Sequence, residues 1–198
     1  MARWKGLKRL RGFFIELQAL DEESYLRMGV GSSSWVPFVP SPLNVVRRML
    51  TLAELEPSEL VCDLGAGDGG IVSVAAAEFG ARAIGVERRA DLVERGKARI
   101  AQAGVKDRAR MVCGDLFHFD LGEADVVTMY LYPGVNERLR PKLERELKRS
   151  ARVVSHDYPV AGWMPCRVEK MSRLGLIDRH TLYLYLPNPM KASTDGRG

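Results

Sequence analysis

Short apolar runs alternate with longer amphipathic stretches throughout residues 60–155. The runs have the length and composition of buried strands, and the stretches between them repeat apolar residues at helical spacing. Strands are expected at residues 60–64, 83–86, 109–112, 126–130 and 151–155, and helices at 43–55, 71–79, 92–103 and 141–148. The alternation predicts an α/β fold with a mostly parallel sheet and helices on both faces.

The C-terminal part breaks this alternation. Residues 167–171 and 181–186 have the pattern of two further strands. The stretch between them is too short for a helical crossover of about a dozen residues, so the two strands should pair antiparallel. The predicted architecture is a Rossmann-like, seven-stranded twisted sheet, mostly parallel, with a C-terminal antiparallel hairpin.

The N-terminal segment has a different pattern. Apolar residues recur at helical spacing between residues 4 and 17, with basic residues between them, and residues 29–34 are rich in glycine and serine. Such a helix can pack on its own domain or on a second subunit, or bind an acidic partner, nucleic acid or membrane. We expect a basic amphipathic extension at 1–34, a catalytic domain at 35–187 and a flexible tail at 188–198.

Charge changes this picture only at the N-terminus. Residues 1–11 hold five of the 30 lysines and arginines and no acid, so the remaining chain balances its 25 acids. A nucleic-acid footprint would therefore belong to the extension, and the catalytic domain should not require nucleic acid. The three cysteines and three histidines show no metal-binding spacing, so no metal is expected. No apolar run is long enough for a transmembrane segment, and no secretory signal is evident, so a cytoplasmic location is expected.

The strongest chemical signal is Asp-Leu-Gly-Ala-Gly-Asp-Gly at residues 63–69, directly after a predicted buried strand. Alternate glycines let the backbone turn sharply and approach a ligand, and the following helix offers N–H groups to a carboxylate. The spacing differs from the G-x-G-x-x-G of a pyrophosphate loop. An acid at this place suits an ammonium group, as at the methionine end of S-adenosylmethionine. Expected cofactor contacts are Asp63, Gly65, Gly67 and Asp68.

Two later acids extend this candidate cofactor site. Glu87 ends the second predicted strand about twenty residues after the glycines, where an acid hydrogen-bonds ribose hydroxyls in nucleotide-binding sheets. Asp115 follows the third strand, where it can accept from the adenine amine while Leu116 covers the ring. Each acid alone also fits an ordinary solvated turn.

The segment before the first helix is a candidate lid. Three prolines within residues 35–42 favour an extended path, and Ser41 can cap the next helix with Pro42 at its first position. We expect Phe38, Val39 and Ser41 to contact the cofactor.

The acceptor should arrive beyond the fourth strand, because ligands of doubly wound sheets bind at the carboxyl ends of the strands. Tyr130 and Tyr132 predict an aromatic wall there, which suits an alkylammonium group, although one of them can equally belong to the core. Tyr130 is also expected to touch the cofactor, and His156 is a further catalytic candidate. The Asn/Asp-Pro-Pro-aromatic motif of base-directed amino methyltransferases is missing.

These motifs together resemble the archaeal broad-specificity protein-lysine methyltransferases, which are related to the mitochondrial ATP synthase c-subunit lysine methyltransferase. The likeness covers residues 35–186 and rests on the runs at 36–42, 45–50, 63–69, 126–131, 136–137, 140–144 and 152–156. It implies the class I methyltransferase fold, a monomer, and transfer from S-adenosylmethionine to exposed lysines, including those of small basic chromatin proteins. Gly70 and Ala66 stand where the family tends to have arginine and cysteine.

Two other functions remain open at this point. The basic extension fits an RNA methyltransferase, against which stand the balanced charge of the catalytic domain and the missing base-directed motif. The chain can also be a non-catalytic chromatin- or ribosome-associated protein that binds the cofactor, although the intact acid and glycines argue against loss of activity.

Overall fold

The computed structural model describes residues 38–172 and 179–186. The chain forms two compact units, residues 1–39 and 40–198, and almost all of the first lies outside the described residues. The predicted N-terminal extension, its boundary at residue 35 and the tail at 188–198 also lie outside them, so all three stay predictions.

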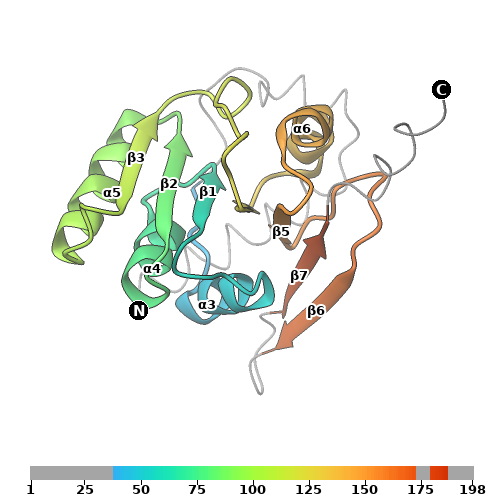
Figure 1. Cartoon of the computed structure of the whole chain (residues 1–198), viewed down its shortest axis with the longest axis horizontal. Coiled ribbons are helices and arrows are strands. Elements are labelled where there is room, and N and C mark those ends of the chain that lie inside the picture. The colour runs from blue at the N-terminus through green and yellow to red at the C-terminus, as the bar shows by residue number, and fades with distance from the viewer. Residues whose placement is uncertain (1–37, 173–178, 187–198) are drawn as a thin grey trace, which may run out of the picture. The chain divides into compact units, whose positions relative to one another are not determined.

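The sheet has seven strands in the order β3-β2-β1-β4-β5-β7-β6 (Figure 1). The strands are β1 (Leu60–Leu64), β2 (Arg82–Glu87), β3 (Ala109–Cys113), β4 (Val126–Met129), β5 (Arg152–His156), β6 (Arg167–Ser172) and β7 (Arg179–Tyr185). Strands β1 to β5 are parallel, while β7 pairs antiparallel with both β5 and β6. The predicted sheet with its C-terminal hairpin is confirmed. The order reverses between β1 and β4, which is where open α/β sheets bind ligands.

Two hydrophobic cores cover the two faces of the sheet. Neighbouring residues of a strand point to opposite faces, so Val61 and Val126 join one core while Cys62 and Val127 join the other. The first core packs against α3 (Leu43–Leu52), α4 (Gly70–Glu78) and α5 (Ala90–Gln102), and the second against α6 (Pro133–Glu146). Both cores lie behind the carboxyl edge of the sheet and fix the positions of the loops there.

Helix α6 begins eight residues earlier than the sequence pattern predicts. Pro133 stands in its first turn, whereas Pro141, expected to begin the helix, lies inside it. An interior proline removes one backbone hydrogen bond and costs about 3 kcal/mol. Asn136, Leu139 and Leu143 are buried at helical spacing on both sides of Pro141, and their packing offsets this cost.

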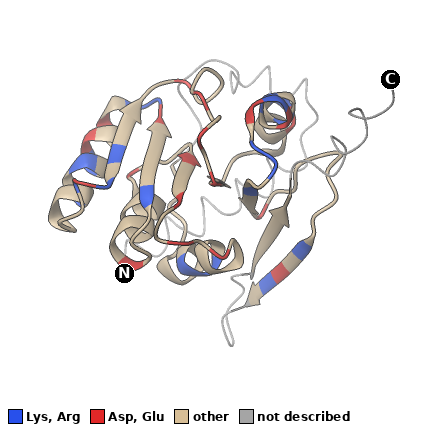
Figure 2. Cartoon of the chain, viewed as in Figure 1, with Lys and Arg blue, Asp and Glu red and all other residues tan. Residues whose placement is uncertain are grey.

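Charges of both signs are interleaved over α5, α6 and β6 (Figure 2). Helix α3 carries two arginines and no acid, but Arg47 pairs with Glu78 of α4 and Arg48 with Glu169 of β6. These pairs tie α3 to its neighbours and neutralise it. Within the described ranges, no helix combines the length and apolar character needed to cross a bilayer.

Candidate active site

A glycine-rich turn at residues 65–69 joins β1 to α4 at the carboxyl edge of the sheet. Gly65, Gly67 and Gly69 all have positive φ angles, of 75°, 53° and 73°. The N–H groups of Gly65 and Ala66 donate to the Val86 carbonyl at 2.9 and 3.0 Å, which holds the turn against β2. A Cβ at Gly65 would lie 2.6 Å from Cδ2 of Leu131. The backbone angles therefore favour glycine at all three positions, and at Gly65 the space beside Leu131 is also limited.

Asp63 lies near the end of β1 with only 3% of its surface exposed. Its Oδ1 accepts a hydrogen bond of 2.7 Å from Thr128 Oγ1, on the paired residue of β4. Burial, with a smaller contribution from Glu87, raises the pKa of Asp63 to about 7, against the opposing bond from Thr128. Among residues 38–172 and 179–186 no lysine or arginine pairs with this carboxylate. A ligand's ammonium group would supply the missing positive charge.

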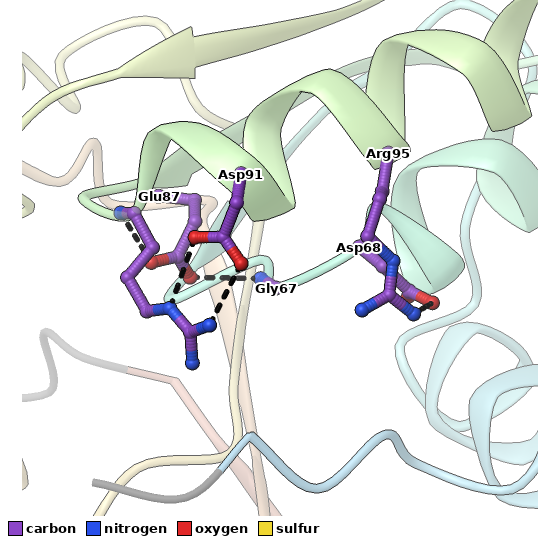
Figure 3. Close-up of polar contacts among 6 residues, drawn as sticks. Gly67, Asp68, Glu87, Asp91 and Arg95 are labelled. Atoms are coloured by element: carbon purple, nitrogen blue, oxygen red, sulfur yellow. Dashed lines mark hydrogen bonds and ion pairs between the residues drawn. The ribbon is translucent and has the colours of Figure 1, made fainter. Parts of the chain in front are cut away.

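Glu87 ends β2 and connects two loops (Figure 3). Its Oε2 accepts from the Gly67 N–H at 3.0 Å, and its Oε1 accepts from the Arg89 N–H at 2.9 Å. Its backbone carbonyl accepts from the Gly114 N–H at 3.0 Å, so the turn after β3 lies beside it. Glu87, the glycine turn and the turn that contains Asp115 are thus brought together, as the sequence motifs predict for one site.

Asp68 has its main partners on α5. Its Oδ2 pairs with Arg99 at 2.5 Å and with Arg95 at 3.6 Å, and its backbone carbonyl accepts from Arg99 Nε at 3.1 Å. Figure 3 shows Asp68 and Arg95 on the other side of Gly67 from Glu87. Its carboxylate fastens the glycine turn to α5, a role that the sequence pattern did not indicate. Whether it also contacts a cofactor stays a prediction.

Asp115 and Leu116 form the turn after β3. Asp115 is exposed, and its Oδ1 accepts from the Phe117 N–H at 2.9 Å. Leu116 is half-buried against the core beneath α6. One carboxylate oxygen is thus used by the turn itself, and Oδ2 lies 3.6 Å from His118 Nδ1.

An aromatic cluster follows β4 and β5. The ring of Tyr130 lies 4.0 Å from that of His156 and 6.1 Å from that of Tyr158, while Tyr132 lies 6.0 Å from Tyr158, all between centroids. Tyr130 is half-buried, whereas Tyr132 is only 5% exposed, so Tyr132 has the burial of a core residue. Tyr158 was not predicted from sequence, because nothing in its local pattern places it opposite β4.

Ser41 does not cap α3, contrary to the sequence expectation. The helix begins after Pro42 with no side-chain cap, and Ser41 Oγ instead lies 2.9 Å from His156 Nδ1. His156 is fully buried, and this burial lowers its pKa to about 4, so the imidazole is neutral near pH 7. Phe38 and Val39 precede Ser41 and are half-buried. Their contact with a cofactor stays a prediction.

Residues 63–167 match the family of ANTKMT methyltransferase domains. A protein-lysine N-methyltransferase of Saccharolobus islandicus is 46% identical over 76% of this chain and 93% of its own length. The ATP synthase c-subunit lysine N-methyltransferase of Homo sapiens is 33% identical over 67% of this chain, which spans 56% of that longer relative.

A solved structure that is similar to this chain is named for another acceptor than the two lysine methyltransferases. It shows an RNA methyltransferase from Salinibacter ruber in complex with S-adenosyl-L-homocysteine. It is 43% identical, covers 74% of this chain and 92% of its own, and superposes with a TM-score of 0.69. These similar proteins agree on the transferred group and differ on the acceptor.

Proposed function

This chain belongs to the ANTKMT methyltransferase family, and from that premise we propose that it methylates the ε-amino groups of protein lysines with S-adenosylmethionine. The structural observation that carries the choice of acceptor is the half-buried Tyr130, whose ring lies tilted against that of a neutral His156 beyond β4. An aromatic face beside an uncharged imidazole attracts and desolvates an alkylammonium group.

The cofactor fits the residues at the carboxyl edge of the sheet. Asp63 is a buried carboxylate without a described cationic partner and suits the cofactor's ammonium group. The start of α4 after the glycine turn suits the methionine carboxylate, and Glu87 suits the ribose hydroxyls. Asp115 and Leu116 are assigned to the adenine. When bound, the cofactor supplies a methyl group already activated on a sulfonium.

The protein's own task is to orient a neutral amine and to exclude water. Lysine has an ordinary pKa of about 10.4, so its ammonium must lose a proton before it attacks. Desolvation among the rings of Tyr130, Tyr158 and His156 lowers that pKa, because burial disfavours the charged form. Alignment of the amine with the methyl carbon can supply about 7–11 kcal/mol of the barrier. A strong dedicated base is therefore not required.

RNA is the second candidate acceptor, supported by the likeness to the RNA methyltransferase of Salinibacter ruber. A nucleic-acid surface normally gathers basic residues on one face. In the described part of the chain, acids interrupt the basic residues along α5, α6 and β6 (Figure 2). This interleaving favours a protein acceptor.

One incubation decides between these acceptors. The full-length enzyme, S-adenosylmethionine, a small basic protein and an RNA transcript are mixed, and both products are read by mass spectrometry. We expect added methyl groups on lysines and none on bases. Asp63→Asn serves as the inactive control. Methylated bases without methylated lysine would refute the lysine proposal, and no methylation of either would favour a non-catalytic protein.

The natural partners are proposed to be proteins with exposed lysines, including small basic chromatin proteins, and the enzyme is proposed to act as a monomer in the cytoplasm. The relative from Saccharolobus islandicus, named for action on protein lysine, supports the substrate class. Light scattering of the purified chain tests the monomer.

Tyr130→Ala is expected to lower kcat/KM for a protein acceptor at least tenfold, or by about 1.4 kcal/mol. The change removes the ring that lies 4.0 Å from His156 and leaves Asp63 and Glu87 in place. Affinity for S-adenosylmethionine should therefore change much less, although Tyr130 is also a predicted cofactor contact. Tyr130→Phe keeps the ring and should retain most activity. Equal losses in both variants would assign the effect to the hydroxyl instead.

Deletion of residues 1–33 is expected to leave cofactor affinity unchanged, because every proposed contact lies at or beyond Phe38. Calorimetry with S-adenosylhomocysteine measures this, and circular dichroism checks that the shortened chain folds. A folded protein without cofactor affinity would move the boundary of the catalytic domain toward the N-terminus.

A further inference from the structure

Asp157 and His180, which the sequence patterns did not single out, meet His156 directly behind Tyr130. His156 Nε2 lies 2.9 Å from His180 Nδ1. Oδ2 of Asp157 lies 3.3 Å from the former nitrogen and 3.5 Å from the latter. His156 ends β5 and His180 lies on the antiparallel β7, so the hairpin at the C-terminus completes this cluster.

The contacts form a continuous line from Ser41 to His180. Ser41 Oγ and His156 Nδ1 are 2.9 Å apart, so both nitrogens of the His156 ring have a partner. Two ring nitrogens at 2.9 Å share one proton, because one of them must donate and the other accept. His156 has no exposed surface, whereas the His180 side chain is 15% exposed. The line therefore begins at Ser41, passes through the buried ring against which Tyr130 lies, and ends at the partly exposed His180.

Asp157 is held in a strained backbone conformation beside the two rings. Its φ is +61°, which few residues other than glycine adopt. Its N–H donates to the Thr181 carbonyl at 2.7 Å, and its Oδ1 accepts from the Thr181 N–H at 2.8 Å. Burial opposes its ionisation, but the neighbouring imidazoles of His180 and His156 keep the pKa of Asp157 below its ordinary value. An anionic Asp157 thus faces both imidazoles.

We propose that Ser41, His156 and His180 conduct to solvent the proton that the acceptor lysine loses before methyl transfer, with Asp157 as the positioning residue. The proposal rests on the proposed lysine methylation. The ammonium gives a proton to Ser41 Oγ, whose own proton passes to His156 Nδ1. The Nε2 proton of His156 passes to His180 Nδ1, and His180 Nε2 gives one proton to water.

One proton enters this pathway and one leaves, and both rings end in the other tautomer. The amine nitrogen then bonds to the methyl carbon while the carbon–sulfur bond breaks, and that electron pair stays on sulfur. His156 is suited to pass a proton rather than to keep it, since burial lowers its pKa to about 4. Among residues 38–172 and 179–186, the groups with a recorded contact to its ring are Ser41, Tyr130, Asp157 and His180.

The test compares His180→Ala and His180→Asn with the full-length wild-type enzyme. Asparagine can hydrogen-bond at the Nδ1 position but cannot conduct a proton. Both variants should lose at least tenfold in kcat, within the usual contribution of positioned acid–base groups, with little change in KM or in cofactor affinity. Added imidazole should restore much of the rate of His180→Ala, and that rate should come to depend on buffer concentration and pH. Val168→Thr, at an exposed position of β6, is the matched control.

A second pair examines the other end of the line. Ser41→Ala should lower kcat at least tenfold, whereas Ser41→Thr keeps the hydroxyl and should restore much of that rate. Calorimetry with S-adenosylhomocysteine on both variants separates this effect from a loss of the cofactor contact predicted at Ser41. Wild-type kcat in His180→Asn would overturn the pathway, and so would a loss of rate in His180→Ala that imidazole does not reverse. Neither result would affect the proposed lysine methylation, which the wild-type enzyme tests separately. The nitrogens of both histidines and an Asp157 oxygen lie close enough to hold a metal ion. Activity that chelator removes and Zn²⁺ alone restores would also overturn the pathway.

Discussion

Asp63→Ala is expected to abolish measurable binding of S-adenosylmethionine. The side chain is the buried carboxylate at the end of β1, and its partner would be a ligand ammonium shielded from water. Calorimetry with S-adenosylhomocysteine measures the loss. Asp63→Asn preserves volume and can still hydrogen-bond Thr128, so an equal loss in that variant would assign the effect to charge.

The same group predicts how cofactor binding depends on pH. Burial raises the pKa of Asp63 to about 7 in the ligand-free protein. Below pH 7 the carboxyl is neutral, so affinity should fall about tenfold for each further pH unit. Above about pH 8 the ligand's own amino group loses its charge, and affinity should fall again. Affinity that is unchanged between pH 6 and about 7.5 would contradict the ammonium partner.

The free energy of unfolding of the ligand-free protein should fall as pH rises toward 7, whereas cofactor affinity should rise over the same range. A raised pKa stabilises the folded protein fully below the unfolded pKa of about 3.9, and this contribution is lost as pH rises through 7. At pH 8 the buried charge costs up to roughly 4 kcal/mol in the ligand-free protein. Asp63→Asn should therefore raise the Tm of the ligand-free enzyme at pH 8 while removing cofactor binding. A lower Tm would mean that Asp63 already has a cationic partner.

Gly65→Val is the other change expected to remove cofactor binding entirely. Its Cβ would collide with Leu131 at 2.6 Å, and a β-branched residue at a φ of +75° is strongly disfavoured. Either the Leu131 side chain or the turn must move, and the strained φ favours a movement of the turn, in which the N–H groups of Gly65 and Ala66 would lose the Val86 carbonyl. Calorimetry with S-adenosylhomocysteine tests this, with circular dichroism to confirm folding.

Gly104→Val is the matched control for this collision. Gly104 has a φ of +69°, and no atom lies within 4 Å of its hypothetical Cβ. The variant incurs similar backbone strain at a distance from the site, so it should lose some stability and keep cofactor affinity. Equal loss of binding in both valine variants would assign the effect to general destabilisation.

The sheet and the cofactor motifs could be read from sequence because their signals are local. Strand β1 was predicted at its observed bounds, since five consecutive buried residues give an unbroken pattern. The spacing of Gly65, Gly67 and Gly69 follows from the positive φ angles of that turn. The start of α6 was missed because proline is a local signal for a helix start, whereas packing on both sides of Pro141 is not local.

The acceptor side could be predicted only in part. Ser41 and His156 meet across 115 positions of the chain, and His180 reaches His156 only through the antiparallel pairing of β5 and β7. Ser41 has the local pattern of a helix cap, so the expectation of capping was wrong for want of this long-range contact. The two arginines that hold Asp68 are likewise ordinary charged positions on an amphipathic helix.

The attachment of the glycine turn to α5 makes the candidate site sensitive to the ionic strength of the solution. Asp68 is nearly buried, but the arginines that hold it are about half-exposed to solvent. Dissolved ions screen exposed charges far more than buried ones. High ionic strength should therefore weaken the two ion pairs of Asp68, which connect α5 to the backbone of the glycine turn. A change at the exposed surface of α5 is thus expected to alter the glycine turn, and with it the affinity for a cofactor proposed to bind there, without direct contact.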